Sequence, residues 1–516
     1  MKMNKLYKLA TLLFGASVLA TGCIQESVVM NGGATIDQIK DSDFGADGMV
    51  NAITAILISN NVYGGDYHDD FGYPSIFGTF DRAIGEVFPS NAYSGGNQYY
   101  DRFQFYHYQF GIGPNGYCGI VWNNYYKFIQ AANDLIRSCG DDPTVAQQRG
   151  VAKAFRALFY LDLARLYDPL YAESTERPTY QADLAAVEGL TVPIIDENTT
   201  EEDAKNNPRR PREEMFQFIF DDLNDAETCL ANYKPTAKNI PSLAVVYGLK
   251  ARAYLWLGGF DSSNYAKAAE YARKAIDTSG ATILTEAQWL DPKTGFNTPN
   301  NSWMWYVPQS PEGVTNLVNF VAWRSCEATW GYGQLVQQGV HVNFYNRIPD
   351  TDWRKRAFIG PDPDAWYEAN AAISNYAANA HGEIFSDYFS PYASVKFRPM
   401  NGETLDWKAG NPTSVCMMRV EEMILTEIEA LAYTDPTTAA AKLTEFMLTR
   451  NPNYSFVSSS TEAVVAEAIW QKRVELWGEG IVFYDMKRLN YGIETGYVGT
   501  NVATDSRMKT DGRAPW

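Results

Sequence analysis

The strongest constraint on the fold is a helical repeat at residues 242–278, which read SLAVVYGLKARAYLWLGGFDSSNYAKAAEYARKAIDT. In its first half, Ala251 and Tyr254 lie three residues apart, as neighbours on one helix face. In its second half, small residues recur at helical spacing: Ala268, Ala272 and Ala275. Small side chains let two antiparallel helices approach closely, and this is the tetratricopeptide pattern of about 34 residues. Because one pair cannot bury its own apolar faces, further pairs are expected.

Other segments with apolar residues at helical spacing are candidates for these further pairs. The expected helices cover residues 48–59, 120–137, 151–167, 213–230, 425–433 and 439–450. The segment from Ala152 to Tyr167 is apolar on nearly every side, which is typical of a buried helix. The predicted fold class is therefore mainly α, a scaffold of about four tetratricopeptide-like helical pairs.

Two regions lack helical periodicity. Residues 71–119 are aromatic and glycine-rich, and are predicted to be loops. Residues 281–415 are rich in Gly, Pro, Asn and Trp, and are predicted to form a large loop-rich insertion with short strands, one of them at Trp303–Val307. The predicted division of the chain is a leader at 1–22, a lipid anchor and tether at 23–43, a scaffold with N-terminal binding loops at 44–280, the insertion at 281–415, and a C-terminal helical pair with closing helices at 416–516.

The first residues predict the compartment. A basic start is followed by a short apolar stretch, Leu9–Leu19, which is too short to span a bilayer as a mature helix. It ends in Ala20-Thr21-Gly22-Cys23, the pattern of a lipoprotein cleavage site, so the thiol of Cys23 is the expected point of lipidation. The alternative is an ordinary secretory signal with a chance cysteine. No later stretch has the apolar character of a transmembrane helix, so the mature protein is expected to sit on a membrane.

Charge and residue usage exclude several function classes. The formal net charge is −18, which disfavours nucleic acids and anionic polysaccharides as partners. Five scattered cysteines follow Cys23 without a C-x-x-C pair, so neither a disulfide framework nor a zinc site is predicted. Residues 111–116 fit G-x-G-x-x-G, but a helical context does not supply the strand–helix unit of a dinucleotide site. No cofactor or metal is predicted.

Several segments resemble the SusD/RagB family of outer-membrane nutrient-binding lipoproteins. They are the leader, WNNYYKFIQAAN (122–133), AKAFRALFYLDLARLYDPL (152–170), the repeat at 242–278, MRVEEMILTEIEALA (418–432) and IWQKRVELWGEGIVFYDMKRLNYG (469–492). Phe483 departs from the last motif, where the family has an arginine, and Ile428 stands where the fifth segment's pattern has an alanine. The matching segments occur in the family's order over nearly the whole chain.

The resemblance implies a role and a scaffold. Members capture glycans at the cell surface and cover a SusC-like TonB-dependent transporter of the outer membrane, by non-covalent binding that is not enzymatic. The charged residues of the last motif are expected to form a partly buried salt-bridge network: Arg473, Glu475, Glu479, Asp485 and Arg488.

Two stretches supply the residue types that bind neutral sugars, namely flat aromatic faces for C–H groups and planar polar groups for hydroxyls. Residues 67–100 offer Asp70, Tyr73, Tyr93 and Asn97. Residues 316–333 offer Phe320, Trp323, Arg324, Trp330 and Tyr332. Of these, Trp330, Tyr332 and Tyr93 are the predicted stacking platforms, and Asp70 and Arg324 the predicted hydroxyl partners. The alternative for each aromatic residue is ordinary core packing, which is the expectation for Trp303 and Trp305.

Two rival functions remain open from the sequence. A surface glycoside hydrolase needs only two carboxylates about 5–10 Å apart, which an acidic chain can supply, and product formation on a bound glycan would identify it. A protein-interaction scaffold of an outer-membrane complex would use its helical groove for peptides, and recovery of a transporter without any glycan affinity would identify it.

Overall fold

The structure is a computed structural model, and it describes residues 45–59, 70–89, 117–170, 186–309 and 319–502, together with 504, 507 and 509. The scaffold helices are α3 (Gly45–Ile56), α4 (Tyr73–Ala83), α7 (Tyr117–Cys139), α8 (Ala146–Tyr167), α10 (Glu201–Lys205), α11 (Arg212–Leu230), α12 (Leu243–Gly258), α13 (Asn264–Ser279), α22 (Val420–Ala432), α23 (Pro436–Leu448), α24 (Thr461–Glu475) and α25 (Val482–Arg488), with the 3₁₀ turn η1 (Pro143–Val145). The fold is mainly α, as predicted.

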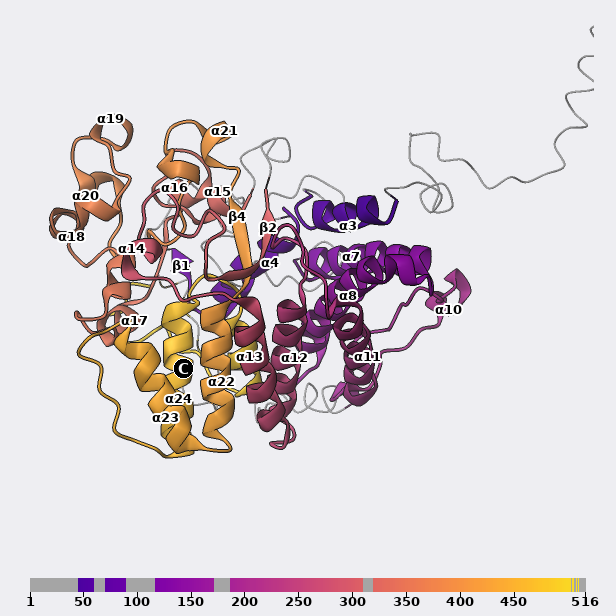
Figure 1. The fold of residues 1–516 in the computed structure, drawn as a ribbon. Coiled ribbons are helices and arrows are strands. Elements are labelled where there is room, and N and C mark those ends of the chain that lie inside the picture. The colour runs from indigo at the N-terminus through magenta and orange to yellow at the C-terminus, as the bar shows by residue number, and fades with distance from the viewer. Residues whose placement is uncertain are drawn as a thin grey trace, which may run out of the picture.

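The long helices pack in the order of the chain. α8 contacts both α7 and α11, α12 contacts both α11 and α13, and α13 contacts α22, which packs on α23 and α24. Figure 1 shows these helices side by side, from α7 and α11 on the right to α23 on the left. This succession of antiparallel neighbours confirms the predicted tetratricopeptide-like scaffold.

The pair α12–α13 shows why the repeat needs small residues. Ala268, Ala272 and Ala275 are completely buried where the two helices meet. A Cβ added at Gly258 would lie only 2.4 Å from Cε1 of Tyr265, so this position of α12 requires glycine. The Tyr254 ring stacks on Phe220 of the preceding helix, with centroids 4.4 Å apart. The alanine and glycine positions thus set the close approach, and tyrosines fill the space beside it.

The insertion is closed at its base by two antiparallel strands. β2 (Trp303–Pro308) pairs with β4 (Ser414–Arg419), so the chain enters and leaves the loop-rich region through one ribbon. Trp303 and Trp305 of β2 are fully buried, as expected for core residues. Between these strands lie α15 (Phe320–Arg324), α16 (Tyr332–Leu335), β3 (Gln338–Gly339), α17 (Val342–Arg347), η2 (Trp353–Ala357), α18 (Pro363–Asn370), η3 (Ala371–Ile373), α19 (Ala378–His381), α20 (Phe385–Tyr388), η4 (Met400–Gly402) and α21 (Trp407–Gly410), and α14 (Glu286–Trp289) precedes β2.

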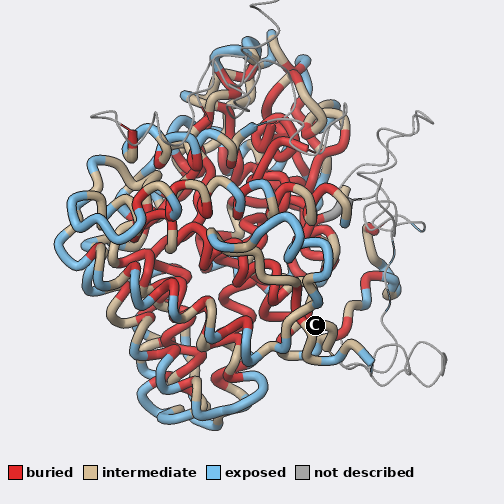
Figure 2. The backbone as a smooth tube through the Cα atoms, turned by 90° about the vertical axis from the view of Figure 1, so that its right-hand side faces the viewer, coloured by how far each residue is buried: buried red, intermediate tan, exposed pale blue. Residues whose placement is uncertain are grey.

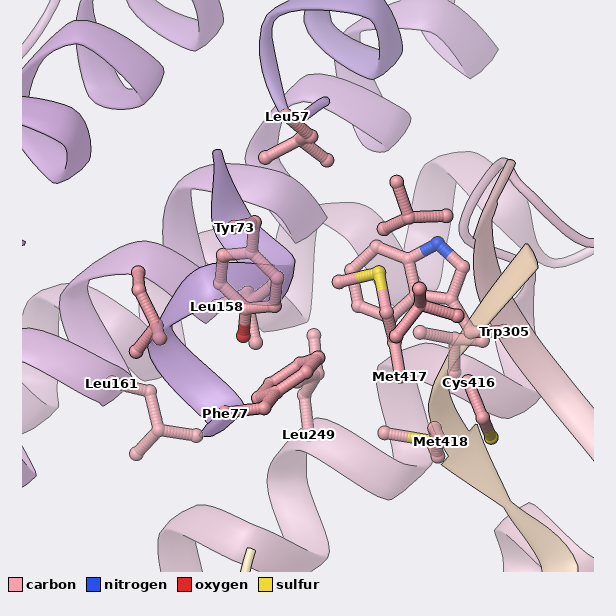
Figure 3. Packing of buried hydrophobic residues seen from close by; sticks show 14 of the residues in the cluster. Leu57, Tyr73, Phe77, Leu158, Leu161, Leu249, Trp305, Cys416, Met417 and Met418 are labelled. Atoms are coloured by element: carbon pink, nitrogen blue, oxygen red, sulfur yellow. The ribbon is translucent and has the colours of Figure 1, made fainter. Parts of the chain in front are cut away.

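The prediction of loops at 71–119 is wrong for its first part. Residues 73–83 form α4, and nearly all of its side chains are buried. In Figure 3, Tyr73 and Phe77 of α4 lie among Leu158 of α8 and Leu249 of α12. Its apolar residues do recur at helical spacing, but Pro74, Gly78 and the aromatic, glycine-rich sequence around it are typical of loops, and its polar side chains are buried together with its apolar ones. The short strand β1 (Phe88–Pro89) follows and pairs with β3. The G-x-G-x-x-G run at 111–116 lies outside the described residues.

The C-terminal charged residues are buried, which corrects the expectation of a partly buried network. Only Asp485 and Arg488 bond to each other, at 2.7 Å. The others pair with distant segments: Arg473 with Glu86, Glu475 with Arg354, Arg419 and Arg450, and Glu479 with Lys396 and Arg419. These ion pairs connect α24 and the turn after it to the insertion and to the segment after α4, so they tie the three parts of the chain together.

Buried residues fill the interior of the molecule, while exposed residues gather on outer turns and loops (Figure 2). Among the helices of the described ranges, none combines the length and the apolar character needed to cross a bilayer.

Candidate functional site

The structure brings the two predicted sugar-binding stretches together. Helix α4 of the first stretch packs against α15 of the second. The Trp323 ring lies 5.5 Å from the ring of Phe71, and the Arg82 guanidinium lies 5.3 Å from the same Trp323 ring. One layer of the site is therefore built from segments about 240 residues apart in the chain.

A buried carboxylate and a buried guanidinium face each other in this layer. Oδ2 of Asp81 lies 4.0 Å from Nη2 of Arg324, and it accepts a hydrogen bond from the backbone N–H of Gly480 at 2.8 Å. Burial raises the pKa of Asp81 to about 7, and the same cause lowers the pKa of Arg324 to about 10. Nη1 of Arg324 donates to Oε1 of Gln338 at 2.8 Å, so this side chain is committed to the interior.

Asp70 and Tyr73 are also interior residues. Oδ1 of Asp70 accepts a hydrogen bond from Asn124 of α7 at 2.8 Å. The Tyr73 hydroxyl donates to Oδ2 of Asp162 of α8 at 2.6 Å, and burial holds the pKa of Tyr73 well above its ordinary value. Both side chains thus fix the start of α4 to the scaffold, and neither offers surface to a ligand in this structure.

The aromatic residues of α15 are buried in the same way. The Phe320 ring meets Phe397 edge-on at 5.1 Å, and Trp323 lies between Phe71 and the partly exposed Tyr332. Burial therefore assigns Phe320, Trp323 and Arg324 the role of supporting the surface residues behind which they pack. The residue types predicted for contact and those needed for support are the same, so the sequence does not distinguish them.

Trp330 lies on the turn between α15 and α16, at the edge of the interior. Gly331 follows it with φ of 83°, a backbone conformation that favours glycine. Two hydrogen bonds connect this turn to the loop before α21. The backbone N–H of Thr329 donates to the Thr404 carbonyl at 2.9 Å, and the Thr329 hydroxyl donates to the same oxygen at 2.6 Å. The Trp330 ring, 8% exposed, packs against Gly410.

Of the predicted stacking platforms that lie within the described residues, Tyr332 is the more accessible, because it is only half-buried. Its ring centroid lies 5.5 Å from that of Trp323, which supports it from below. The same loop that holds Trp330 carries a half-buried tryptophan, Trp407, at the start of α21. Trp407 was not among the predicted contacts. The sequence feature that could have indicated it is its position in the tryptophan-rich insertion. Tyr332 and Trp407 therefore form the candidate surface of the insertion, whereas the burial of Trp330 in the core corrects its prediction as a stacking platform.

The remaining predicted residues lie outside the described ranges: Tyr93, Asn97 and the lipidation candidate Cys23. Within the described ranges, no three His, Cys, Asp or Glu side chains gather in a way that could hold a metal ion.

No protein-family model matches the sequence, and no curated protein matches it. Solved structures match over most of their length. A SusD-like carbohydrate-binding protein from Bacteroides vulgatus has 20% identity, covers 91% of this chain and 90% of its own, and has a TM-score of 0.66. A SusD superfamily protein from Bacteroides fragilis has 18% identity, coverage of 93% and 96%, and a TM-score of 0.63.

A third similar structure is surface glycan-binding protein A from Bacteroides thetaiotaomicron, with 14% identity, coverage of 88% of this chain and 90% of that chain, and a TM-score of 0.62. All three alignments include both the helical scaffold and the greater part of the insertion, because they leave out only about a tenth of the chain. The sequence resemblance is thus confirmed at the level of architecture: this chain has the same fold as these solved structures.

Proposed function

We propose that this protein binds an oligosaccharide or polysaccharide at the cell surface and delivers it to a SusC-like TonB-dependent transporter. The observation that supports this most strongly is the likeness, over about nine tenths of both chains, to structures described as SusD-like carbohydrate-binding and surface glycan-binding proteins. Binding is non-covalent in this proposal and uses no cofactor.

The candidate surface has the chemistry that such a role requires. The Tyr332 and Trp407 rings are partly exposed on adjoining segments of the insertion, and buried side chains hold the first of them in place. Aromatic faces cover the C–H face of a sugar ring, and several weak contacts along one surface suit an extended chain. In our proposal the buried Trp330, which packs against Gly410 of α21, holds these two segments together.

The proposed location is the outer surface of the outer membrane, with lipid on Cys23 as the anchor. A Cys23→Ser variant is expected to lose its lipid and to leave the membrane fraction, whereas wild-type protein stays with it. Co-purification of a TonB-dependent transporter with the wild-type protein tests the partner. Recovery of a Cys23→Ser protein in the membrane fraction would contradict the anchor.

The binding function is tested by a screen of uncharged and anionic polysaccharides with the purified protein, followed by analysis of each bound glycan for cleavage. We expect retention of at least one uncharged glycan and no products. Release of shorter oligosaccharides would instead establish the glycoside hydrolase alternative. Recovery of a transporter in the absence of any glycan binding would establish the scaffold alternative.

A further inference from the structure

A groove lies on the scaffold, at the opposite end of the molecule from the insertion. It is bordered by residues 194–208, which include α10, and by the exposed face of α11. Figure 1 shows α10 and α11 at the right and α16 and α21 at the upper left, so this groove is separate from the candidate surface. Its main cavity has a volume of about 920 Å³, which is the size of sites that bind small ligands.

A second cavity of about 590 Å³ lies beside the groove, between α7, α8 and α11. Asn198 lines both cavities, and Glu197 of the second adjoins Asp196 of the first. Two neighbouring cavities that share a lining residue offer contacts in succession, which suits a chain better than a compact molecule.

The wall formed by residues 193–207 is fixed to the scaffold through its own backbone. Ile195 exchanges two hydrogen bonds with the Tyr160 hydroxyl, its N–H donating at 2.7 Å and its carbonyl accepting at 2.8 Å. The Tyr126 hydroxyl donates to the carbonyl of Pro193 at 2.8 Å, and Asn207 donates to that of Ile194 at 2.6 Å. Because these anchors come from buried or half-buried groups, the groove is preformed, and binding would not have to order it.

The lining of the main cavity combines one aromatic ring with planar polar groups. Phe218 of α11 is half-buried, and its ring is held by Tyr160 at 5.4 Å and by the Arg156 guanidinium at 4.9 Å. Four amide side chains also line this cavity: Asn198, Asn206, Asn207 and Gln217. An aromatic ring beside paired donors and acceptors is the combination that holds sugar hydroxyls and C–H groups.

Charge narrows the class of ligand. The main cavity has five carboxylates and one arginine in its lining, so it repels uronic acids and sulfated sugars. The second cavity is balanced in charge, with three cationic side chains (Arg137, Arg149 and Lys153) and three carboxylates (Asp141, Glu197 and Asp225), and Lys153 is paired with Asp225. An uncharged chain avoids electrostatic repulsion in both cavities, and a basic peptide is the alternative ligand that the carboxylates would admit. The carboxylates are also partly engaged already, as in the 3.2 Å pair between Glu214 and Arg210.

We infer that this groove is a second binding site for an uncharged oligosaccharide, independent of the Tyr332–Trp407 surface. The inference deepens the proposed function and rests on it for the class of ligand. Two sites at opposite ends of one molecule would let the protein hold a polymer at two points, which raises the apparent affinity for long chains without new contacts.

The test uses calorimetric titration of the purified protein with four uncharged hexasaccharides: maltohexaose, cellohexaose, xylohexaose and mannohexaose. The groove variant is Gln217→Ala with Asp221→Ala, an exposed pair on α11 joined by a 2.8 Å hydrogen bond. The matched control is Glu270→Ala with Lys274→Ala, an exposed i,i+4 pair on α13 with a 2.7 Å contact. A second groove variant, Asn198→Trp, places a bulky ring at the residue that lines both cavities. The insertion surface is removed separately by Tyr332→Ala.

We expect two sites on the wild-type protein for one of these sugars. Both groove variants should weaken one site by about tenfold or more, while the control pair and Tyr332→Ala leave that site unchanged. A single site that disappears in Tyr332→Ala would overturn the groove inference and leave the proposed function standing. Sugar binding that is lost only in the groove variants would support the groove inference. It would also show that the insertion surface does not bind these sugars.

Two further outcomes would overturn the inference. In the first, both groove variants bind every sugar as the wild type does. In the second, tetralysine binds in place of the sugars, is released by high salt, and is lost in the Gln217→Ala, Asp221→Ala variant but not in the control. That result would identify the groove as a site for a basic peptide.

Discussion

Replacing Glu475 by glutamine is expected to unfold the protein at a much lower denaturant concentration. This carboxylate is 0% exposed and lies at the centre of the ion-pair network. It accepts hydrogen bonds from three guanidinium groups: from Arg354 at 3.0 Å, from Arg419 at 2.9 Å, and from Arg450 at 3.1 Å. Glutamine keeps the shape of the side chain but removes its charge, so three buried cations lose their shared partner.

The size of the stability loss follows from the burial of Glu475 and its three arginine partners. Removing one partner of a buried ion pair costs about 3–5 kcal/mol, because the remaining charge is left without compensation. In the Glu475→Gln variant, Arg354 still pairs with Asp352 at 2.6 Å and Arg419 still pairs with Glu479 at 2.9 Å. Because these two arginines keep a carboxylate partner, the expected cost stays within that range and is not counted once for each arginine. A loss of about 4 kcal/mol lowers the ratio of folded to unfolded protein by about three orders of magnitude.

The pH dependence should change as well. The surrounding cations hold the pKa of Glu475 well below its ordinary value of 4.5, despite the opposing effect of burial. A carboxylate with a depressed folded-state pKa contributes stability that is present above the unfolded-state value and lost as the pH falls. The wild-type protein should therefore lose this contribution below about pH 4.5, and Glu475→Gln should lack that part of the acid slope.

The measurement is urea unfolding followed by circular dichroism, at neutral pH and along an acid series. Glu462→Gln, an exposed change at the start of the same helix, is the control and is expected to cost less than about 1 kcal/mol. If Glu475→Gln costs no more than this control, the network does not hold the insertion and the closing helices together as described.

Three further variants test other parts of the structure. The folded-state pKa of Asp81 is raised to about 7, so the wild type should lose stability as the pH rises from about 4 to about 7. Asp81→Asn should abolish that loss, and a pH profile of stability identical to that of the wild type would contradict the raised pKa. Gly410→Ala places a Cβ 2.6 Å from Cζ2 of Trp330, so it should cost about 1–3 kcal/mol in thermal unfolding and weaken glycan binding by moving that ring; wild-type behaviour in both would refute the packing. Tyr73→Phe removes the bond to Asp162 and should cost about 1–2 kcal/mol with glycan affinity unchanged, and a drop in affinity would show that Tyr73 belongs to the binding surface.

The helical scaffold could be predicted because its signal is local. The small residues that let α12 and α13 meet recur every three or four positions, and such spacing is visible in any short window. Helix α4 was missed although its apolar residues also recur at helical spacing, because Pro74, Gly78 and the aromatic, glycine-rich sequence around it are typical of loops. Its role depends on neighbours that are distant in the chain.

Separation in the sequence also explains why the partners in the ion pairs could not be predicted. Arg473 and Glu86 are 387 residues apart in sequence, and neither residue type nor spacing indicates that they meet. For the candidate site, aromatic abundance drew the prediction to the insertion, but tryptophan and tyrosine fill cores as readily as they line surfaces. Burial therefore separates Trp323, an internal support, from Tyr332, which lies eight residues after α15 ends and reaches the surface.

Glycan binding by Tyr332→Ala protein is the decisive comparison, because this ring is the accessible predicted platform of the described chain. With an uncharged glycan found in the screen, the variant should bind about tenfold more weakly at the insertion surface, while its thermal unfolding midpoint stays near that of the wild type. A wild-type protein that retains no carbohydrate, or a Tyr332→Ala variant with unaltered affinity at every site, would contradict passive capture of sugar by this surface.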